Sequence, residues 1–293
     1  MSKKNQFSKP KVRAPTGNFN TGERVIGDTE YNRRKTNAET ESIIDYEGIE
    51  NFNLSLEEKA HYIHHSNSVE GINLGLDTTY EILENPDKFK HFNFKILDVG
   101  DFSANVVLDH EKALNYILNL STNESITENI IKKAHFLLMQ NIMPSDYKAG
   151  EYRTKSISVG KKKISDEYTE KYIAPDSKKV PEYMTHLEDM ILDLEVKSQV
   201  TEQDCWTIHD EFETIHPFID GNGRTGRLLL NALLLRYNFS THIVLMKDKD
   251  KYFQKIRVHG KERNIGKFVK EKIPTQEDKF LALYLAMEQD QQK

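Results

Sequence analysis

The chain has 293 residues, with 41 Lys and Arg against 46 Asp and Glu, and a formal net charge of −5. Hydrophobic residues make up 37% of it, and no apolar run approaches the roughly 20 residues that a membrane span needs. This composition excludes a membrane-spanning protein and predicts a soluble one. The lone cysteine, Cys205, excludes an intrachain disulfide, and no apolar segment follows the N-terminal lysines. We therefore expect a cytoplasmic protein without a membrane partner.

The N-terminal region, residues 1–54, contains Lys-Pro and Ala-Pro-Thr-Gly turns without sustained periodicity, which predicts an irregular extension. Lys and Arg are frequent over residues 3–35 and again over 247–272, so both stretches could contact nucleic acid. Neither stretch interleaves aromatic residues with a recognisable nucleic-acid motif. We expect solvated basic faces and no nucleic-acid partner.

A helix should begin after Ser55, because Ser55 and Glu58 have the spacing of a capping box, and it should end near Gly71. The region 55–95 that contains it is expected to pack on the rest of the chain. Further helices are predicted where start signals precede periodic apolar residues, namely after Asp109, Thr127, Pro181 and Thr201 and around 228–235.

Residues 156–174 differ from these helices, because Ile157 and Val159 alternate with polar residues and a second short apolar segment follows a basic turn. This pattern predicts a β-hairpin. The residues after Pro274 leave room for one more helix. The expected fold class is all-α: a helical core over 96–293 with a small β-hairpin flap and a C-terminal helix.

The most informative segment runs from His216 to Arg227 and reads His-Pro-Phe-Ile-Asp-Gly-Asn-Gly-Arg-Thr-Gly-Arg. Pro217 disfavours the α conformation at His216. The preceding helix should therefore end near Ile215 and leave the imidazole at the edge of a loop. An imidazole has the right pKa to accept a proton near neutral pH.

The residues after this histidine predict an anion site. Gly221 and Gly223 flank Asn222 and permit backbone angles that turn successive N–H groups inward as a nest. The nest leads into the N-terminus of a helix, where free N–H groups and the positive dipole end attract the same anion. Arg224 and Arg227 fall on one face of that helix and could bind further phosphate oxygens.

Asp220, beside the nest, is placed to hold Mg²⁺, which prefers a carboxylate together with substrate phosphates, so the set suits a nucleoside triphosphate.

Two other interpretations of this segment are weaker. Gly221-x-Gly223-x-x-Gly226 also spells a dinucleotide fingerprint, but that motif must follow a buried parallel strand, and Pro217 is excluded from central strands. A purely structural loop does not need His, Asp, Asn and two Arg together.

The whole segment matches, at every fixed position, the signature His-x-Phe-x-Asp/Glu-Gly-Asn-Gly-Arg-x-x-Arg, and the chain therefore resembles the Fic (filamentation induced by cAMP) family. The resemblance covers about residues 100–272 and includes Gly150-Glu151-Tyr152-Arg153. It implies that His216 deprotonates a Tyr, Ser or Thr hydroxyl, that Asp220 holds Mg²⁺ and that Arg227 meets the γ-phosphate. It assigns the α- and β-phosphates to Gly221, Asn222, Gly223 and Arg224.

A shorter motif lies N-terminal to this core. Ser66-Asn67-Ser68-Val69-Glu70-Gly71 resembles the family's inhibitory motif Ser/Thr-x-x-x-Glu-Gly/Asn. The resemblance implies that Glu70, on the same motif as Ser66, occupies the place of the γ-phosphate and pairs with Arg227, since an arginine facing an empty anion site favours a carboxylate partner. A helix that ends in a glutamate and a glycine cap is the plain alternative.

The sequence thus predicts an autoinhibited, Mg²⁺-dependent protein adenylyltransferase that moves AMP from ATP to a hydroxyl of a target protein or of the chain itself. Tyr252 lies where Fic proteins line the adenine pocket, although residues 254–261 depart from the common Ala-Asn pattern. UMP transfer, phosphocholine transfer, phosphorylation and AMP removal stay open as family alternatives. A non-enzymatic nucleic-acid-binding regulator is a further one, and a homo-oligomer also stays open.

Overall fold

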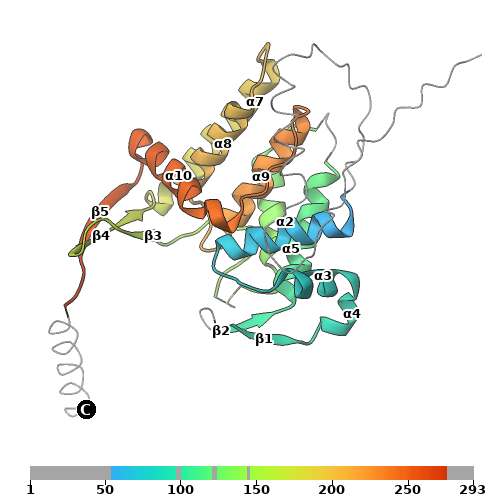
Figure 1. Ribbon diagram of the computed structural model, residues 1–293. Coiled ribbons are helices and arrows are strands. Elements are labelled where there is room, and N and C mark those ends of the chain that lie inside the picture. Colours follow the sequence, from blue (N-terminus) through green and yellow to red (C-terminus); the bar gives the residue numbers. More distant parts are fainter. Residues whose placement is uncertain (1–53, 97–99, 121–123, 144–145, 276–293) are drawn as a thin grey trace, which may run out of the picture.

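The computed structural model describes residues 54–96, 100–120, 124–143 and 146–275, and most of these residues are helical (Figure 1). The predicted helical fold class with a small sheet is confirmed. Residues 1–53 of the predicted extension and the predicted C-terminal helix lie outside the described residues. The described α-helices are α2 (Leu56–Val69), α3 (Leu76–Glu84), α4 (Pro86–Phe89), α5 (Asn105–Leu118), α6 (Glu128–Met139), α7 (Val180–Val196), α8 (Glu202–Ile215), α9 (Asn222–Arg236) and α10 (Lys249–Arg263).

Five strands and two short 3-10 turns complete the described chain. The strands are β1 (Asn93–Ile96), β2 (Gly100–Ser103), β3 (Ser158–Lys163), β4 (Tyr168–Ile173) and β5 (Lys267–Lys272), and the turns are η2 (Ser177–Lys179) and η3 (Met246–Asp248). Among the described residues, no helix combines the length and apolar character that crossing a membrane requires.

The predicted start signals act as expected at several helices. Ser55 and Glu58 form a reciprocal capping box at α2, and Thr201 forms another with Asp204 at α8. The helix expected after Asp109 instead begins at Asn105. The reason is that Asp109 is buried and caps nothing: its carboxylate accepts hydrogen bonds from the backbone and side-chain N–H groups of Asn141, at 3.2 and 2.9 Å.

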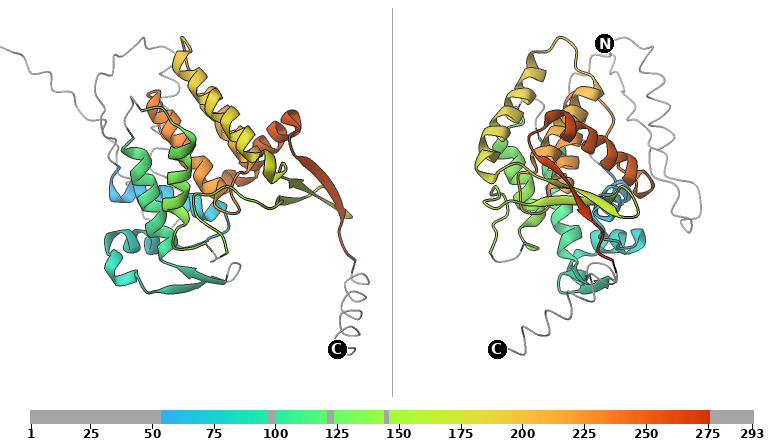
Figure 2. Two further views of the ribbon diagram at one scale, coloured as in Figure 1. Left: turned by 180° about the vertical axis from the view of Figure 1, so that it is seen from behind. Right: turned by 90° about the vertical axis from the view of Figure 1, so that its left-hand side faces the viewer.

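Helix α9 lies at the centre of the molecule and packs against α8, α5, α6 and α2 (Figures 1 and 2). Its leucines are buried around most of its circumference, as expected for a helix enclosed by others. Each such side chain stabilises the fold by about 1.5–3 kcal/mol relative to exposure. The N-terminus of α9, which carries the signature segment, is therefore placed by the core itself.

The predicted hairpin is confirmed as β3 and β4, which pair antiparallel. The sheet has a third strand that the sequence analysis did not predict, because β5 pairs antiparallel with β4 on its other side. Figures 1 and 2 show this sheet projecting from the helical body. Tyr172 of β4 anchors it, since its hydroxyl donates to the carbonyl of Thr214 in the last turn of α8, at 2.9 Å.

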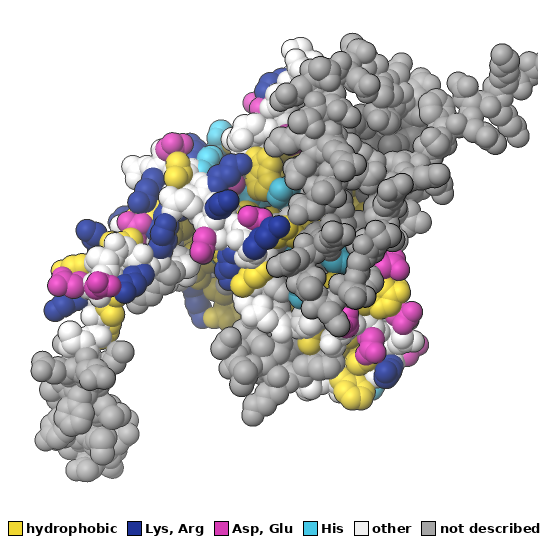
Figure 3. All heavy atoms as spheres, in the orientation of Figure 1, with side chains coloured by type: hydrophobic (Ala, Val, Ile, Leu, Met, Phe, Trp, Pro, Cys, Tyr) yellow, Lys and Arg dark blue, Asp and Glu magenta, His cyan; other side chains and the backbone are white. Residues whose placement is uncertain are grey.

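The basic stretch 247–272 is not a uniformly positive surface. Figure 3 shows Lys and Arg side chains interleaved with Asp and Glu at the end of the molecule that carries α10 and the sheet. Glu170 pairs with Arg257 and, at 3.3 Å, with Lys261, while Glu211 pairs with Arg263 at 2.8 Å. These pairs attach α10 to β4 and α8.

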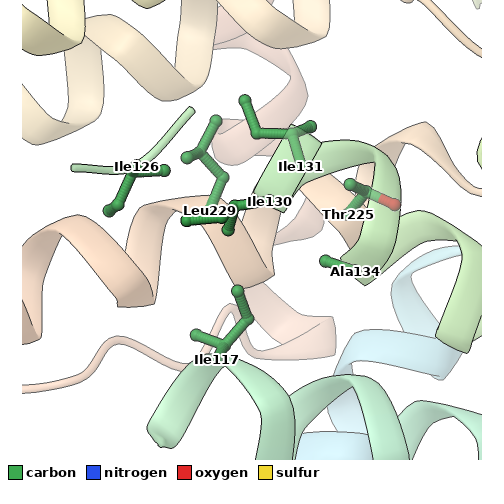
Figure 4. A pocket seen from close by; sticks show the side chains of 7 residues that line it. All are labelled: Ile117, Ile126, Ile130, Ile131, Ala134, Thr225 and Leu229. Atoms are coloured by element: carbon green, nitrogen blue, oxygen red, sulfur yellow. The ribbon is translucent and has the colours of Figure 1, made fainter. Parts of the chain in front are cut away.

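A small cavity lies between α5, α6 and α9 (Figure 4). Aliphatic side chains from these helices and from Ile126 form most of its wall, and Thr225 is the polar residue among those that line it. An apolar wall of this kind does not suit a charged nucleotide.

Candidate active site

The loop between α8 and α9 is held by a buried amide. The side chain of Asn222 accepts a hydrogen bond from the Phe218 N–H at 2.8 Å and donates one to the Phe218 carbonyl at 2.9 Å. Phe218 itself is fully buried and packs in the core. The Asn222 side chain therefore shapes the loop, and its backbone N–H is the part that remains for a ligand.

His216 follows the last residue of α8 and adopts the left-handed conformation, with φ of 52°. Its Nδ1 lies 3.2 Å from the carbonyl of Glu213, which can only accept, so Nδ1 carries the proton and Nε2 keeps a free lone pair. Burial lowers the pKa of His216 to about 4, against the opposing effect of the Glu213 carbonyl. The imidazole is thus neutral at pH 7 and able to accept a proton.

Arg153 holds this histidine from the backbone side. Its Nε donates to the His216 carbonyl at 2.8 Å, and its own backbone N–H donates to the Pro217 carbonyl at 2.9 Å. The guanidinium is buried at the C-terminal end of α8, where a positive charge complements the helix dipole. Arg153 therefore fixes the entry of the chain into the loop.

The N-terminus of α9 presents free backbone donors. The first intrahelical hydrogen bond runs from the Thr225 N–H to the Gly221 carbonyl, so the N–H groups of Asn222, Gly223 and Arg224 precede the helical ladder. Gly221 has φ of 76°, and a Cβ there would lie 2.7 Å from Sδ of Met139. A Cβ at Gly223 would overlap a Glu70 carboxylate oxygen.

Arg224 is only 3% exposed. Its Nη2 lies 3.5 Å from Sδ of Met139, while Nε and Nη1 have no hydrogen-bond partner among the described residues. Burial lowers the pKa of Arg224 from its ordinary value. A buried guanidinium with unused donors is costly unless an anion binds it, so these atoms fit a phosphate ligand.

The predicted pair between Glu70 and Arg227 is present. Glu70 follows the last residue of α2, and its Oε1 accepts a hydrogen bond from Arg227 Nη2 at 2.8 Å. Ser66 accepts two further hydrogen bonds from Arg227: its hydroxyl oxygen from Nε at 3.0 Å and its carbonyl oxygen from Nη2 at 2.8 Å. Burial alone would raise the pKa of Glu70, but the charge of Arg227 and this hydrogen bond hold it below its usual range.

Tyr252 lies beside this pair and not on an open face. Its ring is buried, and its hydroxyl lies 3.4 Å from Arg227 Nη1 and 3.0 Å from Nε2 of His209. The structure therefore brings Tyr252 to the arginine, and its predicted contact with adenine stays a prediction. Asp220, in contrast, is exposed, and its Oδ1 accepts the Gly221 N–H at 2.6 Å.

Two buried residues at this site were missed by the sequence analysis. Glu213 of α8 lies against Gly226 and has its pKa raised to about 8 by burial and by the charge of Glu70. His135 of α6 contacts the carbonyl of Asp220. Neither carries a local sequence signal, because each resembles any other polar residue on an amphipathic helix.

This chain is similar to known proteins of one family. Residues 125–234 match the family model described as Fic/DOC family, and the whole His216 to Arg227 segment lies within the match. The chain carries a Fic domain. Protein adenylyltransferase Fic of Nematostella vectensis is 29% identical over 212 residues, which cover 71% of this chain and 45% of that protein. Its Drosophila willistoni counterpart is 30% identical over 226 residues, covering 76% of this chain and 41% of that protein.

The chain thus spans less than half the length of these Fic relatives. Among solved structures, a Fic domain containing signaling protein from Bacteroides thetaiotaomicron superposes with a TM-score of 0.56 at 24% identity, over 68% of this chain and 70% of that one. Fic-1 from C. elegans gives a TM-score of 0.52 at 25% identity, over 69% and 55% of the two chains. The helical fold with its small sheet is therefore that of Fic proteins.

Proposed function

We propose that this chain is a protein adenylyltransferase that transfers AMP from ATP to a hydroxyl group of a protein. The observation that carries the proposal is the buried Arg224, two of whose donors have no partner within the described part of the chain, beside the first N–H groups of α9 and a neutral His216. Cationic and backbone donors of this kind stabilise a phosphate that reacts in line with an incoming oxygen. The name shared by the relatives supports AMP as the group transferred.

In the proposed reaction, Nε2 of His216 accepts the proton of a Tyr, Ser or Thr hydroxyl. The hydroxyl oxygen forms a bond to the α-phosphorus, the bond from that phosphorus to the bridging oxygen breaks, and pyrophosphate leaves. The first turn of α9 and Arg224 would bind the α- and β-phosphates, and Arg227 the γ-phosphate. By binding the phosphates, the first turn of α9, Arg224 and Arg227 would keep the α-phosphorus near the imidazole. This positioning would itself raise the rate.

We propose that Asp220 holds Mg²⁺ together with phosphate oxygens. Its carboxylate is exposed next to the nest, and one carboxylate with substrate phosphates is a usual donor set for this ion. When bound, Mg²⁺ would neutralise charge on the phosphates and on the departing pyrophosphate.

We further propose that the protein is autoinhibited in the conformation described. Glu70 accepts a hydrogen bond from Arg227 and lies directly against Gly223, so its carboxylate takes the place that an anionic γ-phosphate would need. ATP would then bind in a pose that does not align the α-phosphate for attack. In this division of the chain, the region 55–95 is the inhibitory region and residues 96–293 are the catalytic core.

The test compares the wild-type chain with His216→Ala, using ATP labelled in adenine or on the γ-phosphate, and labelled UTP and CDP-choline in parallel. Adenine label should enter protein and γ label should not. His216→Ala should lower incorporation by about 10²–10⁴-fold while calorimetry still detects ATP binding, because the phosphate site is intact. EDTA should stop the reaction. Incorporation of γ label, or wild-type activity in His216→Ala, would contradict the assignment.

A further inference from the structure

His135 of α6 is fully buried, and both of its ring nitrogens have partners. Nδ1 accepts a hydrogen bond from the Gly150 N–H at 2.8 Å, and Nε2 lies 2.9 Å from the carbonyl of Asp220. Because Gly150 N–H can only donate and a carbonyl can only accept, Nε2 carries the proton. The ring is thus held as a single neutral tautomer.

The ring also stacks on a residue of the signature loop. The centroids of His135 and Phe218 are 3.7 Å apart, with an angle of 9° between the ring planes. Phe218 lies midway between His216 and Asp220 in sequence, so the imidazole supports the middle of the loop by stacking and its end by a hydrogen bond. One helical turn further along α6, the side chain of Met139 lies against Gly221.

These contacts fix the peptide that joins Asp220 to Gly221. The carbonyl of this peptide accepts from His135, and its N–H donates to the Asp220 carboxylate at 2.6 Å. Rotation of the peptide would break both hydrogen bonds together. The direction of the carboxylate is therefore coupled to the hydrogen bond from the imidazole.

The imidazole of His135 is also linked to the His216 end of the loop, through the segment that contains Gly150 and Arg153. Gly150, which it holds by its N–H, lies three residues before Arg153, and the Arg153 guanidinium donates to the His216 carbonyl at 2.8 Å. His135 therefore connects, by short paths, to both the histidine and the aspartate of the site.

We propose that His135 is a positioning residue, which acts through the Asp220 carbonyl to hold the Asp220 carboxylate in the direction that receives Mg²⁺. The inference rests on the proposed function, in which Asp220 holds this ion. Outer contacts that orient a metal ligand usually contribute about 10- to 100-fold to metal affinity. A residue that only fills the core would contribute to stability and leave the affinity for Mg²⁺ unchanged.

Two substitutions separate these roles, because each keeps one of the two hydrogen bonds. In His135→Gln the side-chain amide nitrogen reaches the position of Nε2 and can still donate to the Asp220 carbonyl. In His135→Asn the shorter side chain places an acceptor near the position of Nδ1 for the Gly150 N–H and does not reach Asp220. Leu138→Ala is a matched control, since Leu138 is a fully buried apolar neighbour on α6.

The experiment uses the full chain with Glu70→Gly as the parent, and measures three quantities for each variant: the thermal midpoint, the Mg²⁺ concentration for half-maximal labelling, and calorimetric affinity for a non-hydrolysable ATP analogue with and without Mg²⁺. His135→Asn should need at least about 10-fold more Mg²⁺ than the parent for half-maximal labelling, while its affinity for the analogue in EDTA should be unchanged. His135→Gln should stay within about 3-fold of the parent, and Leu138→Ala should lower only the midpoint.

Equal Mg²⁺ dependence in His135→Asn and the parent would overturn the proposal, as would equal losses in the Asn and Gln variants. If the parent itself transfers no AMP, the proposed function fails. The calorimetric comparison with and without Mg²⁺ then still decides whether His135 positions the carboxylate.

Discussion

Replacing Glu70 with glycine should raise AMP transfer, although the change removes a charged group from the site. Glu70 Oε1 lies 2.8 Å from Arg227 Nη2, and the carboxylate lies against Gly223 in the first turn of α9. A γ-phosphate bound by Arg227 would need the same place, so carboxylate and phosphate compete. The two hydrogen bonds from Arg227 to Ser66 remain in the variant, which keeps α2 attached.

The expected gain follows from the strength of this one ion pair. A hydrogen bond between charged groups contributes about 1.5–3 kcal/mol. Solvent reduces that contribution here, because the Glu70 side chain is 30% exposed while that of Arg227 is 2% exposed. We assign about 1–2 kcal/mol to the pair, which corresponds to a roughly 5- to 30-fold increase in the population that binds ATP productively.

The assay follows incorporation of adenine label at subsaturating ATP. Glu57→Gly is the matched control, because Glu57 is an exposed glutamate in the first turn of the same helix. It should leave incorporation unchanged, and Arg227→Ala should cancel the gain of Glu70→Gly. Competition between Glu70 and the γ-phosphate is refuted if a folded Glu70→Gly protein incorporates no more label than the wild type, or if Glu57→Gly gives the same increase.

Two further substitutions test the space at Gly223 and the protonation of the buried Glu213. In the Glu70→Gly background, Gly223→Ala should lower labelling on the order of 10²-fold, because the added Cβ lies 3.1 Å from Arg227 Nη1 and points toward the phosphate position; unchanged labelling would show that no phosphate lies there. Glu213 has its pKa raised by burial from 4.5 to about 8, so between these values the folded state keeps a proton that the unfolded state has lost, and stability falls as pH rises. Glu213→Gln has no such proton to lose, so its thermal midpoint should rise relative to that of the wild type between about pH 6 and about pH 8. A difference between the two midpoints that does not change with pH would contradict a buried protonated acid.

Local sequence determined the features whose physics is local. Ser55 and Glu58 form their capping box within one helical turn, so spacing alone was sufficient to predict it, and the start signal at Thr201 is equally local because its partner is Asp204. Pro217 disfavours the α conformation at the residue before it, and Gly221 permits a positive φ, which is why the end of α8 and the turn into α9 could be placed from the sequence. The pair of Glu70 with Arg227 was predicted from the resemblance of both motifs to one family.

Tertiary structure decided the features that join distant segments. Strand β5 was not predicted, because its register is set by β4, almost one hundred positions earlier, and its own sequence is mostly charged. The contacts of the Asn222 side chain were not predicted for a related reason: its amide forms hydrogen bonds with Phe218 inside the loop, which only the folded loop reveals. His135 contacts Asp220 from 85 positions away, and nothing near it in the sequence marks that contact. Hydrogen bonds between such segments depend on how the helices pack, and packing is a property of the whole core.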